Sequence, residues 1–66
     1  MKNNLTEREM EVLMLIGEGL VTKEVAGKLR ISARTVETHR RNIHEKLDVH
    51  NATAAIYKAR QLNVLS

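Results

Sequence analysis

The stretch ISARTVETHRRNIHEKL, residues 31–47, decides the fold. It contains neither Pro nor Gly, and Ser32 stands where a hydroxyl can accept a hydrogen bond from a free backbone N–H of a first helical turn. At 3.6 residues per turn, three apolar residues fall on one side of such a helix: Val36, Ile43 and Leu47. The stretch therefore predicts one long amphipathic helix, residues 33–47, whose apolar side docks on a small core.

The opposite side of this predicted helix is polar. It carries Arg34, Thr38, Arg41 and Glu45, with Glu37 and Asn42 beside them. Guanidinium, hydroxyl and carboxylate groups are those that read base edges in the major groove of DNA. The plain alternative is a surface helix whose charged side is only solvated, and the residues before position 31 favour the first interpretation.

The first helix is predicted over residues 7–18. Thr6 and Glu9 have the spacing of a capping box, and Leu5 can pack back on the helix as a hydrophobic staple. Gly19 is the expected left-handed residue after its end.

A short second helix is predicted over residues 23–29, with Thr22 as its N-cap. A tight turn then leads into the long helix, which makes the pair a helix-turn-helix. Many such motifs have Gly in the turn, whereas this chain has Arg30, so we expect a turn that is looser or not left-handed there. Asn51 caps a last helix over residues 52–62.

Asn63 is the expected C′ residue of that last helix, and residues 1–4 are expected to be a disordered tail. The fold class that results is all-α, a four-helix bundle with a central helix-turn-helix, in one domain over residues 5–66. A chain of 66 residues buries only about 60% of the surface that its unfolded form exposes, so its stability should be marginal. There is no Cys to add a disulfide, although dimerisation could compensate.

The net charge of +3 is unevenly distributed. Residues 1–18 sum to −2, whereas residues 19–30 and 31–47 sum to +2 each. A basic middle favours a polyanionic partner over a membrane. No apolar run approaches the ~20 residues of a membrane span, and residues 2–11 are too polar for a signal peptide, so we expect a cytoplasmic protein.

Signs of catalysis or of a bound cofactor are missing from the sequence. The three histidines, His39, His44 and His50, lack the spacing of a zinc motif and have no Cys partner, so no metal site is expected. There is no phosphate-binding loop, dinucleotide fingerprint or nucleophile elbow. His39 is expected at the edge of the core as a hydrogen-bonded residue, with a phosphate contact as the alternative. We therefore expect no enzyme and no cofactor.

Several residues are candidates for contact with DNA. Arg34 and Arg41 can each pair with guanine O6 and N7, or else bind phosphate. For Glu37 an ion pair to Arg41 is favoured over reading a cytosine. Lys23 lies in the first turn of its helix, where a phosphate would also meet the helix dipole.

A second feature is apolar. Met10, Met14 and Leu15 lie outside the main core stripe of the first helix. They either fill irregular gaps in the core or form a patch that meets a second domain or subunit.

The chain resembles the LuxR-type DNA-binding domain, the effector module of NarL/FixJ-type response regulators and of quorum-sensing regulators. The resemblance covers residues 5–65 and rests on three segments: LTEREMEVLMLIGEGL, TKEVAGKL and ISARTVETHRRNIHEKLDV. It implies that the third helix is the recognition helix. The base contacts it implies are Arg34, Glu37, Thr38 and Arg41, and the backbone contacts are Lys23, Thr35 and Lys46.

The resemblance also implies partners: double-stranded DNA, a second copy bound through the last helix, and possible contacts with RNA polymerase and with an N-terminal receiver or ligand-binding domain. The residues of the last helix that point away from the core, and so are expected at the dimer contact, are Ala54, Tyr57, Lys58 and Gln61. The chain departs from the family pattern at Thr22, Asp48, Ala52 and Asn63. The last two lie in or beside the dimer helix, which makes the dimer mode the least secure implication.

Two alternatives remain at this stage. Region 4 of an RNA polymerase sigma factor opens with a similar pattern, but this chain continues with HRRNIHEKL where sigma regions have an R-A-x-x-x-L-R-type segment. A protein-interaction module would instead use the Met10, Met14 and Leu15 patch, and its basic helix would only be solvated.

Overall fold

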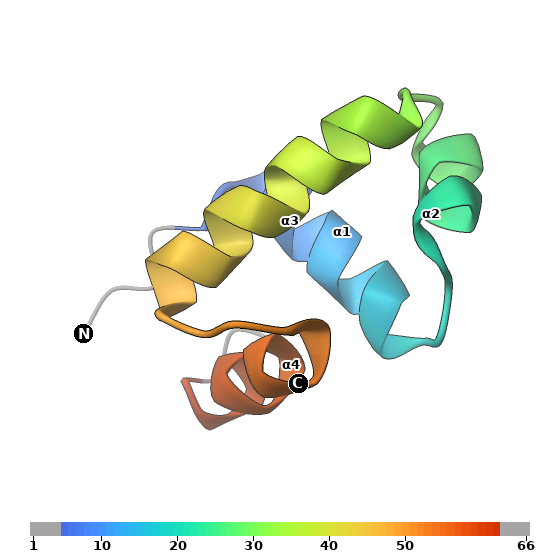
Figure 1. Cartoon of the computed structure of the whole chain (residues 1–66). Coiled ribbons are helices and arrows are strands. Elements are labelled where there is room, and N and C mark those ends of the chain that lie inside the picture. Colours follow the sequence, from blue (N-terminus) through green and yellow to red (C-terminus); the bar gives the residue numbers. More distant parts are fainter. Residues whose placement is uncertain (1–4, 63–66) are drawn as a thin grey trace.

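The computed structural model describes residues 5–62, which fold into four helices and no strand. The helices are α1 (Glu7–Gly17), α2 (Thr22–Leu29), α3 (Ala33–Leu47) and α4 (Ala52–Gln61). Figure 1 shows α3 as the longest element, with the other three arranged along it. The all-α prediction with a central helix-turn-helix is confirmed, and α1 and α4 each end one residue earlier than predicted. The predictions for residues 1–4 and for Asn63 lie outside the described residues.

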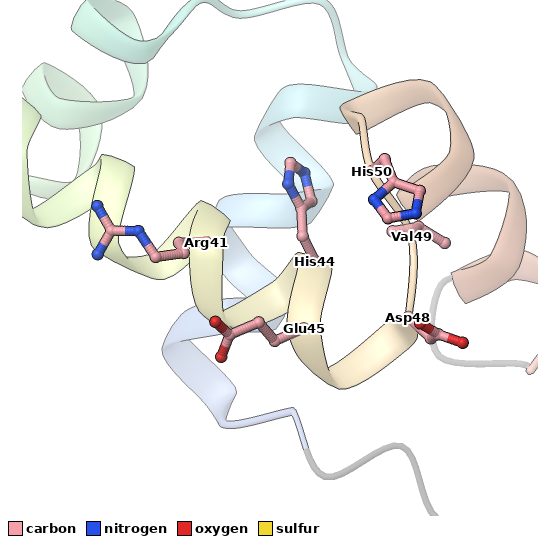
Figure 2. A pocket seen from close by; sticks show the side chains of 6 residues that line it. All are labelled: Arg41, His44, Glu45, Asp48, Val49 and His50. Atoms are coloured by element: carbon pink, nitrogen blue, oxygen red, sulfur yellow. The ribbon is translucent and has the colours of Figure 1, made fainter.

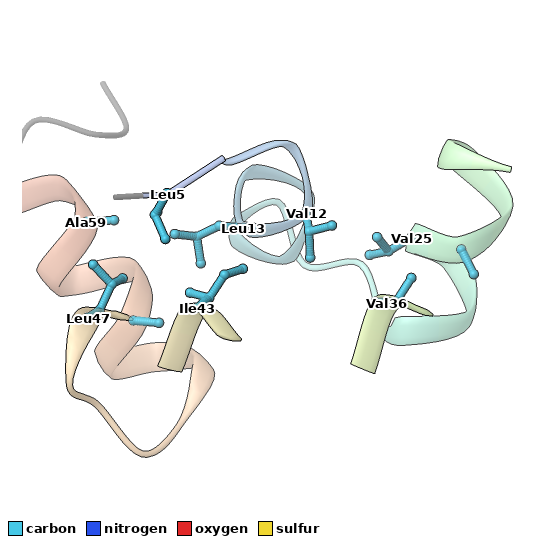
Figure 3. Packing of buried hydrophobic residues seen from close by; sticks show 10 residues of the cluster. Leu5, Val12, Leu13, Val25, Val36, Ile43, Leu47 and Ala59 are labelled. Carbon is cyan, nitrogen blue, oxygen red and sulfur yellow. The ribbon is translucent and has the colours of Figure 1, made fainter. Parts of the chain in front are cut away.

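The core lies where α3 contacts α1, α2 and α4. Val36 packs beside Val25 and Val12 near one end of α3, and Leu47 lies toward α4 at the other (Figure 3). Two alanines of α4, Ala55 and Ala59, are completely buried, so that helix approaches its neighbours closely. The buried apolar residues are Leu5, Val12, Leu13, Val25, Ala26, Val36, Ile43, Leu47, Ala55 and Ala59. The apolar stripe predicted for α3 is confirmed.

Three helix starts have the caps that the sequence predicts. At α1, the Glu9 N–H donates to Thr6 Oγ1 at 3.1 Å, and the Thr6 N–H donates to Glu9 Oε1 at 2.9 Å, which completes the capping box. Ser32 Oγ accepts from the Thr35 N–H at 3.0 Å. Asn51 Oδ1 accepts from the Ala54 N–H at 2.8 Å.

The predicted N-cap of α2 is wrong by one residue. Val21 is the N-cap, and Thr22 is the first residue of the helix. The Thr22 hydroxyl donates instead to Glu37 Oε2 on α3, at 2.8 Å. The Val21 N–H donates to Glu24 Oε1 at 2.9 Å. The first turn of α2 is therefore closed by a carboxylate and not by a hydroxyl cap.

The turn between α2 and α3 is left-handed, contrary to our expectation. Arg30 has φ 59° and ψ 43°, which favour Gly because a Cβ crowds the backbone there. This conformation lets the Ile31 N–H reach Ala26 O at 3.0 Å, while the Ile31 side chain packs on the core. Hydrogen bonding and burial therefore impose the turn without Gly. Gly19, with φ 98°, is left-handed as predicted.

Asp48 makes the corresponding turn after α3, with φ 57°. The Val49 N–H then donates to His44 O at 3.0 Å, and the chain turns back toward α4. Within residues 5–62 no helix is long and apolar enough to cross a membrane.

Candidate nucleic-acid interface

One side of α3 is open to solvent along its length. Arg34, Thr38 and Arg41 are exposed, on the side opposite the buried Val36 and Ile43. Neither arginine makes an ion pair within the described residues, so both guanidinium groups are available to a ligand. We define the exposed side of α3 from Arg34 to Arg41 as the reading face.

Two threonines near the reading face are held by hydrogen bonds. Thr35 Oγ1 lies 2.9 Å from Ser32 Oγ, at the start of α3. The Thr38 hydroxyl donates to Arg34 O at 3.2 Å. Since that hydroxyl proton is used within the helix, Thr38 presents its methyl group and its free lone pairs outward.

The predicted ion pair between Glu37 and Arg41 is wrong. Glu37 Oε1 lies 3.9 Å from Arg40 Nε instead, while its other oxygen accepts from Thr22. The start of α2 lies close enough to draw the carboxylate toward Thr22 and Arg40. As a result Glu37 connects α2 to α3, and Arg41 is left without a carboxylate partner.

Lys46 has a structural partner that the sequence did not indicate. Its Nζ lies 2.8 Å from Oε1 of Glu9, a residue that is only 3% exposed. Burial raises the pKa of Glu9, but the Lys46 hydrogen bond, the Thr6 N–H and the charges of Lys46 and His39 outweigh it, so the pKa is below its ordinary value. The pair therefore holds the last turn of α3 against the start of α1.

The other predicted phosphate contact, Lys23, is exposed in the first turn of α2. It makes no ion pair within the described part of the chain. Glu24 already places a carboxylate at this helix end, on the Val21 N–H. An incoming phosphate would meet the lysine, but it would compete with Glu24 for the helix dipole.

His39 is half-buried at the edge of the core, yet the hydrogen bond expected for it is not seen at Nδ1. That atom is buried and has no partner among the described residues. The position predicted for His39 at the edge of the core is therefore confirmed, whereas a hydrogen bond at this nitrogen is not.

On α4, Tyr57 is two-thirds exposed and accepts a hydrogen bond from Gln61 Nε2 at 3.1 Å. The other two residues predicted at a dimer contact, Ala54 and Lys58, are half-buried. All four lie on the side of α4 away from the buried Ala55 and Ala59, and the dimer contact stays a prediction.

The methionine patch is only partly open. Met14 is half exposed, whereas Met10 and Leu15 pack against the core. Met14 and Leu15 line a hollow of about 270 Å³ with Glu11, Lys28 and Leu29. Met10 and Leu15 therefore fit the prediction that the group fills gaps in the core, whereas Met14 fits the prediction of an exposed patch.

Comparison with known proteins identifies the family. The model of the luxR family of bacterial regulatory proteins matches residues 3–59. The chain is 50% identical over 62 residues to the uncharacterized response regulatory protein YgeK of Escherichia coli, covering 94% of this chain and 42% of that protein. It is 46% identical over 61 residues to the response regulator protein VraR of Staphylococcus aureus, covering 92% of this chain and 29% of that protein.

Solved structures agree. The response regulator ChrA of a heme-sensing two-component system superposes with a TM-score of 0.92 at 43% identity, covering 98% of this chain and 32% of that one. The transcription factor GerE gives 0.91 at 35% identity, covering 100% and 97%. The chain thus spans less than half the length of these response regulators, and nearly the whole of GerE. These matches favour the LuxR-type interpretation over a sigma-factor region. The chain belongs to the luxR family of bacterial regulatory proteins, as a helix-turn-helix DNA-binding domain.

Proposed function

We propose that the domain recognises a specific duplex sequence by placing the reading face of α3 in the major groove. The observation that carries the proposal is the pair of exposed guanidinium groups, Arg34 and Arg41, neither of which makes an ion pair within residues 5–62. Seven residues of helix span about 10 Å, or about three base steps. The two arginines therefore suit two guanines about three steps apart in one half-site, with Thr38 between them.

Phosphate contacts would fix the helix in the groove. Lys23 and Thr35 lie at the starts of α2 and α3 and suit this role. Lys46 would share its charge between Glu9 and the duplex, since it is one-third exposed. Glu37 acts by holding α2 against α3, and it does not read a base.

Two copies paired through α4 would bind two half-sites about one helical turn apart. Because the relatives are response regulators of which this chain spans a part, we infer that the complete regulator carries an N-terminal receiver or ligand-binding domain. It would act in the bacterial cytoplasm, where its DNA and RNA polymerase are found. No enzymatic step is needed for this activity.

The first prediction concerns the reading face. Selection from a random duplex library at about physiological salt should enrich a motif with paired half-sites. The variant Arg34→Ala/Arg41→Ala should bind that motif about 100-fold more weakly, because each bidentate guanine contact contributes about 1–3 kcal/mol of discrimination. Binding is measured by fluorescence anisotropy at fixed salt.

A matched control removes the same charge elsewhere. Arg8 and Arg60 are exposed on α1 and α4, and Arg8→Ala/Arg60→Ala lowers the net charge equally. That control should lose only a few-fold in affinity through the general field. If the two double variants bind alike, α3 is not the reading element, and the protein-interaction alternative gains.

A further inference from the structure

The reading face continues into a hollow at the C-terminal end of α3. This hollow, of about 440 Å³, is bounded by Arg41, His44, Glu45, Asp48, Val49 and His50. Figure 2 shows the rings of His44 and His50 on one side of it, and the carboxylates of Glu45 and Asp48 pointing away from them. Because Arg41 belongs to both surfaces, the hollow adjoins the reading face, and a duplex on that face would lie near it.

The two imidazole rings have free ring nitrogens. Within the described part of the chain neither ring makes a hydrogen bond. His50 is exposed, and His44 is half-buried without a buried orphan nitrogen, so its ring nitrogens are open to solvent. A neutral ring offers one N–H donor and one acceptor, whereas the protonated ring offers two N–H donors and a positive charge, and so binds an anion more strongly. Within residues 5–62 no group of three or more His, Cys, Asp or Glu has the arrangement of a metal site.

The formal charge of the hollow changes sign when the rings are protonated. With neutral rings, Arg41 is outnumbered by Glu45 and Asp48, and the hollow is negative. With both rings protonated, three cations face two carboxylates, and the hollow is positive. Phosphate is repelled in the first state and attracted in the second.

The charged surroundings of His44 come from α3 and from the connector to α4. Burial lowers the pKa of His44, the charges of Arg40 and His50 lower it further, and Glu37 opposes them. Helices α1 and α4 contribute no side chain to the lining. The free domain therefore holds His44 neutral near pH 7, and a nearby phosphate would favour its protonation.

We propose that this hollow is a second contact site for the phosphate backbone of the bound duplex, engaged when His44 and His50 are protonated, so that affinity for DNA rises as pH falls. The inference rests on the proposed function, since α3 must first lie on DNA. Because the pKa of His44 is lowered in the free domain, binding takes up a proton there, and the affinity for DNA rises as pH falls.

The test compares the dissociation constant of each protein at about pH 6 with that at about pH 7.5, at fixed salt. The probes are the selected duplex and a random-sequence duplex of the same length, and circular dichroism verifies folding at each pH. The parent should bind both probes about tenfold tighter at the lower pH, since the uptake of one proton per complex changes the dissociation constant by up to about tenfold per pH unit. His44→Gln/His50→Gln should lose most of that ratio.

Two further variants sharpen the result. His50→Lys fixes a positive charge, so it should raise the affinity at the higher pH and reduce the pH ratio. Arg60→Gln removes a charge outside the hollow and should keep the parent's ratio. The inference is overturned if the double histidine variant retains the parent's ratio, or if the parent binds equally at both pH values. If the parent binds neither duplex at either pH, the proposed function itself fails.

Discussion

The ion pair of Glu9 and Lys46 joins the start of α1 to the end of α3. Glu9 accepts from the Thr6 N–H, so it closes the first turn of α1, and it accepts from Lys46 Nζ in the last turn of α3. A nearly buried carboxylate with two donors resists protonation, which agrees with its lowered pKa. One side chain therefore caps a helix and fixes the recognition helix at the same time.

Removing the counter-charge should destabilise the fold. Lys46→Met keeps the length of the side chain but leaves Glu9 buried without its cation, and should lower the free energy of unfolding by about 2–4 kcal/mol. Glu9→Gln/Lys46→Met removes both charges and should lose less. Urea unfolding at neutral pH measures both, and equal stability of Lys46→Met and the parent would mean that the pair contributes nothing.

The same pair predicts the acid branch of the stability curve. The pKa of Glu9 in the folded state lies below its ordinary value of 4.5, so the folded state binds fewer protons than the unfolded state in acid. Its contribution is complete above about 4.5 and is lost as pH falls through the folded pKa. Lys46→Met should lose less stability than the parent between neutral pH and acid.

At the scale of the element, α3 is enclosed by two left-handed residues that are not Gly. Arg30 precedes it and Asp48 follows it, with φ values of 59° and 57°. Each conformation is held by hydrogen bonds of the next N–H, from Ile31 and from Val49. The backbone at both ends of α3 therefore has a conformation that is unfavourable for a residue with a Cβ, and the hydrogen bonds that follow compensate for it.

Glycine at these turns should relieve the strain. Arg30→Gly and Asp48→Gly should each be about 1 kcal/mol more stable than the corresponding alanine variant, which also lacks the charge but keeps a Cβ. Gly19→Ala is the reverse test and should lower the free energy of unfolding by about 1 kcal/mol. An added Cβ meets no atom within 4 Å, so the loss would come only from the left-handed backbone conformation. Thermal unfolding gives the differences, and a glycine variant no more stable than its alanine partner would contradict this account.

The helix starts that could be predicted from the sequence are those set by contacts between residues close together in the chain. Thr6 with Glu9, Ser32 and Asn51 are caps within three residues of their partners, so the starts of α1, α3 and α4 follow from the sequence. The Thr22 hydroxyl donates to Glu37, fifteen positions away, and so does not cap α2 as predicted. The same contact drew Glu37 away from Arg41. Contacts between residues far apart in the sequence produce no periodic pattern from which they could be predicted. The pair of Lys46 and Glu9 is a second contact of this kind.

On the scale of the whole molecule, the docking of α4 determines which surface is left for a partner. Ala55 and Ala59 are completely buried, so Tyr57, on the other side of the helix, is turned out to solvent. Exposure of a large aromatic side chain at two-thirds of its surface suits a contact between proteins. The face proposed for pairing and the reading face therefore lie on different elements, α4 and α3.

Pairing through α4 gives the last prediction. Tyr57→Ala should weaken binding to a duplex with two half-sites about tenfold, because effective concentration between the copies is lost, while binding to a single half-site stays unchanged. Arg60→Ala on the same helix should weaken binding to both probes only slightly and by the same factor. Both are read by anisotropy on matched probes, and equal losses on the two probes would place Tyr57 outside the pairing surface.

The separation of the two sides of α3 has a consequence for how such a regulator changes. Val36, Ile43 and Leu47 fill the core, whereas Arg34, Thr38 and Arg41 support none of it. If the reading face binds DNA as proposed, substitutions at the second set can redirect the domain to another promoter without compensating substitutions in the core. A duplicated gene could therefore acquire a new regulon through a few codons, and an engineer could exchange those same codons as a cassette.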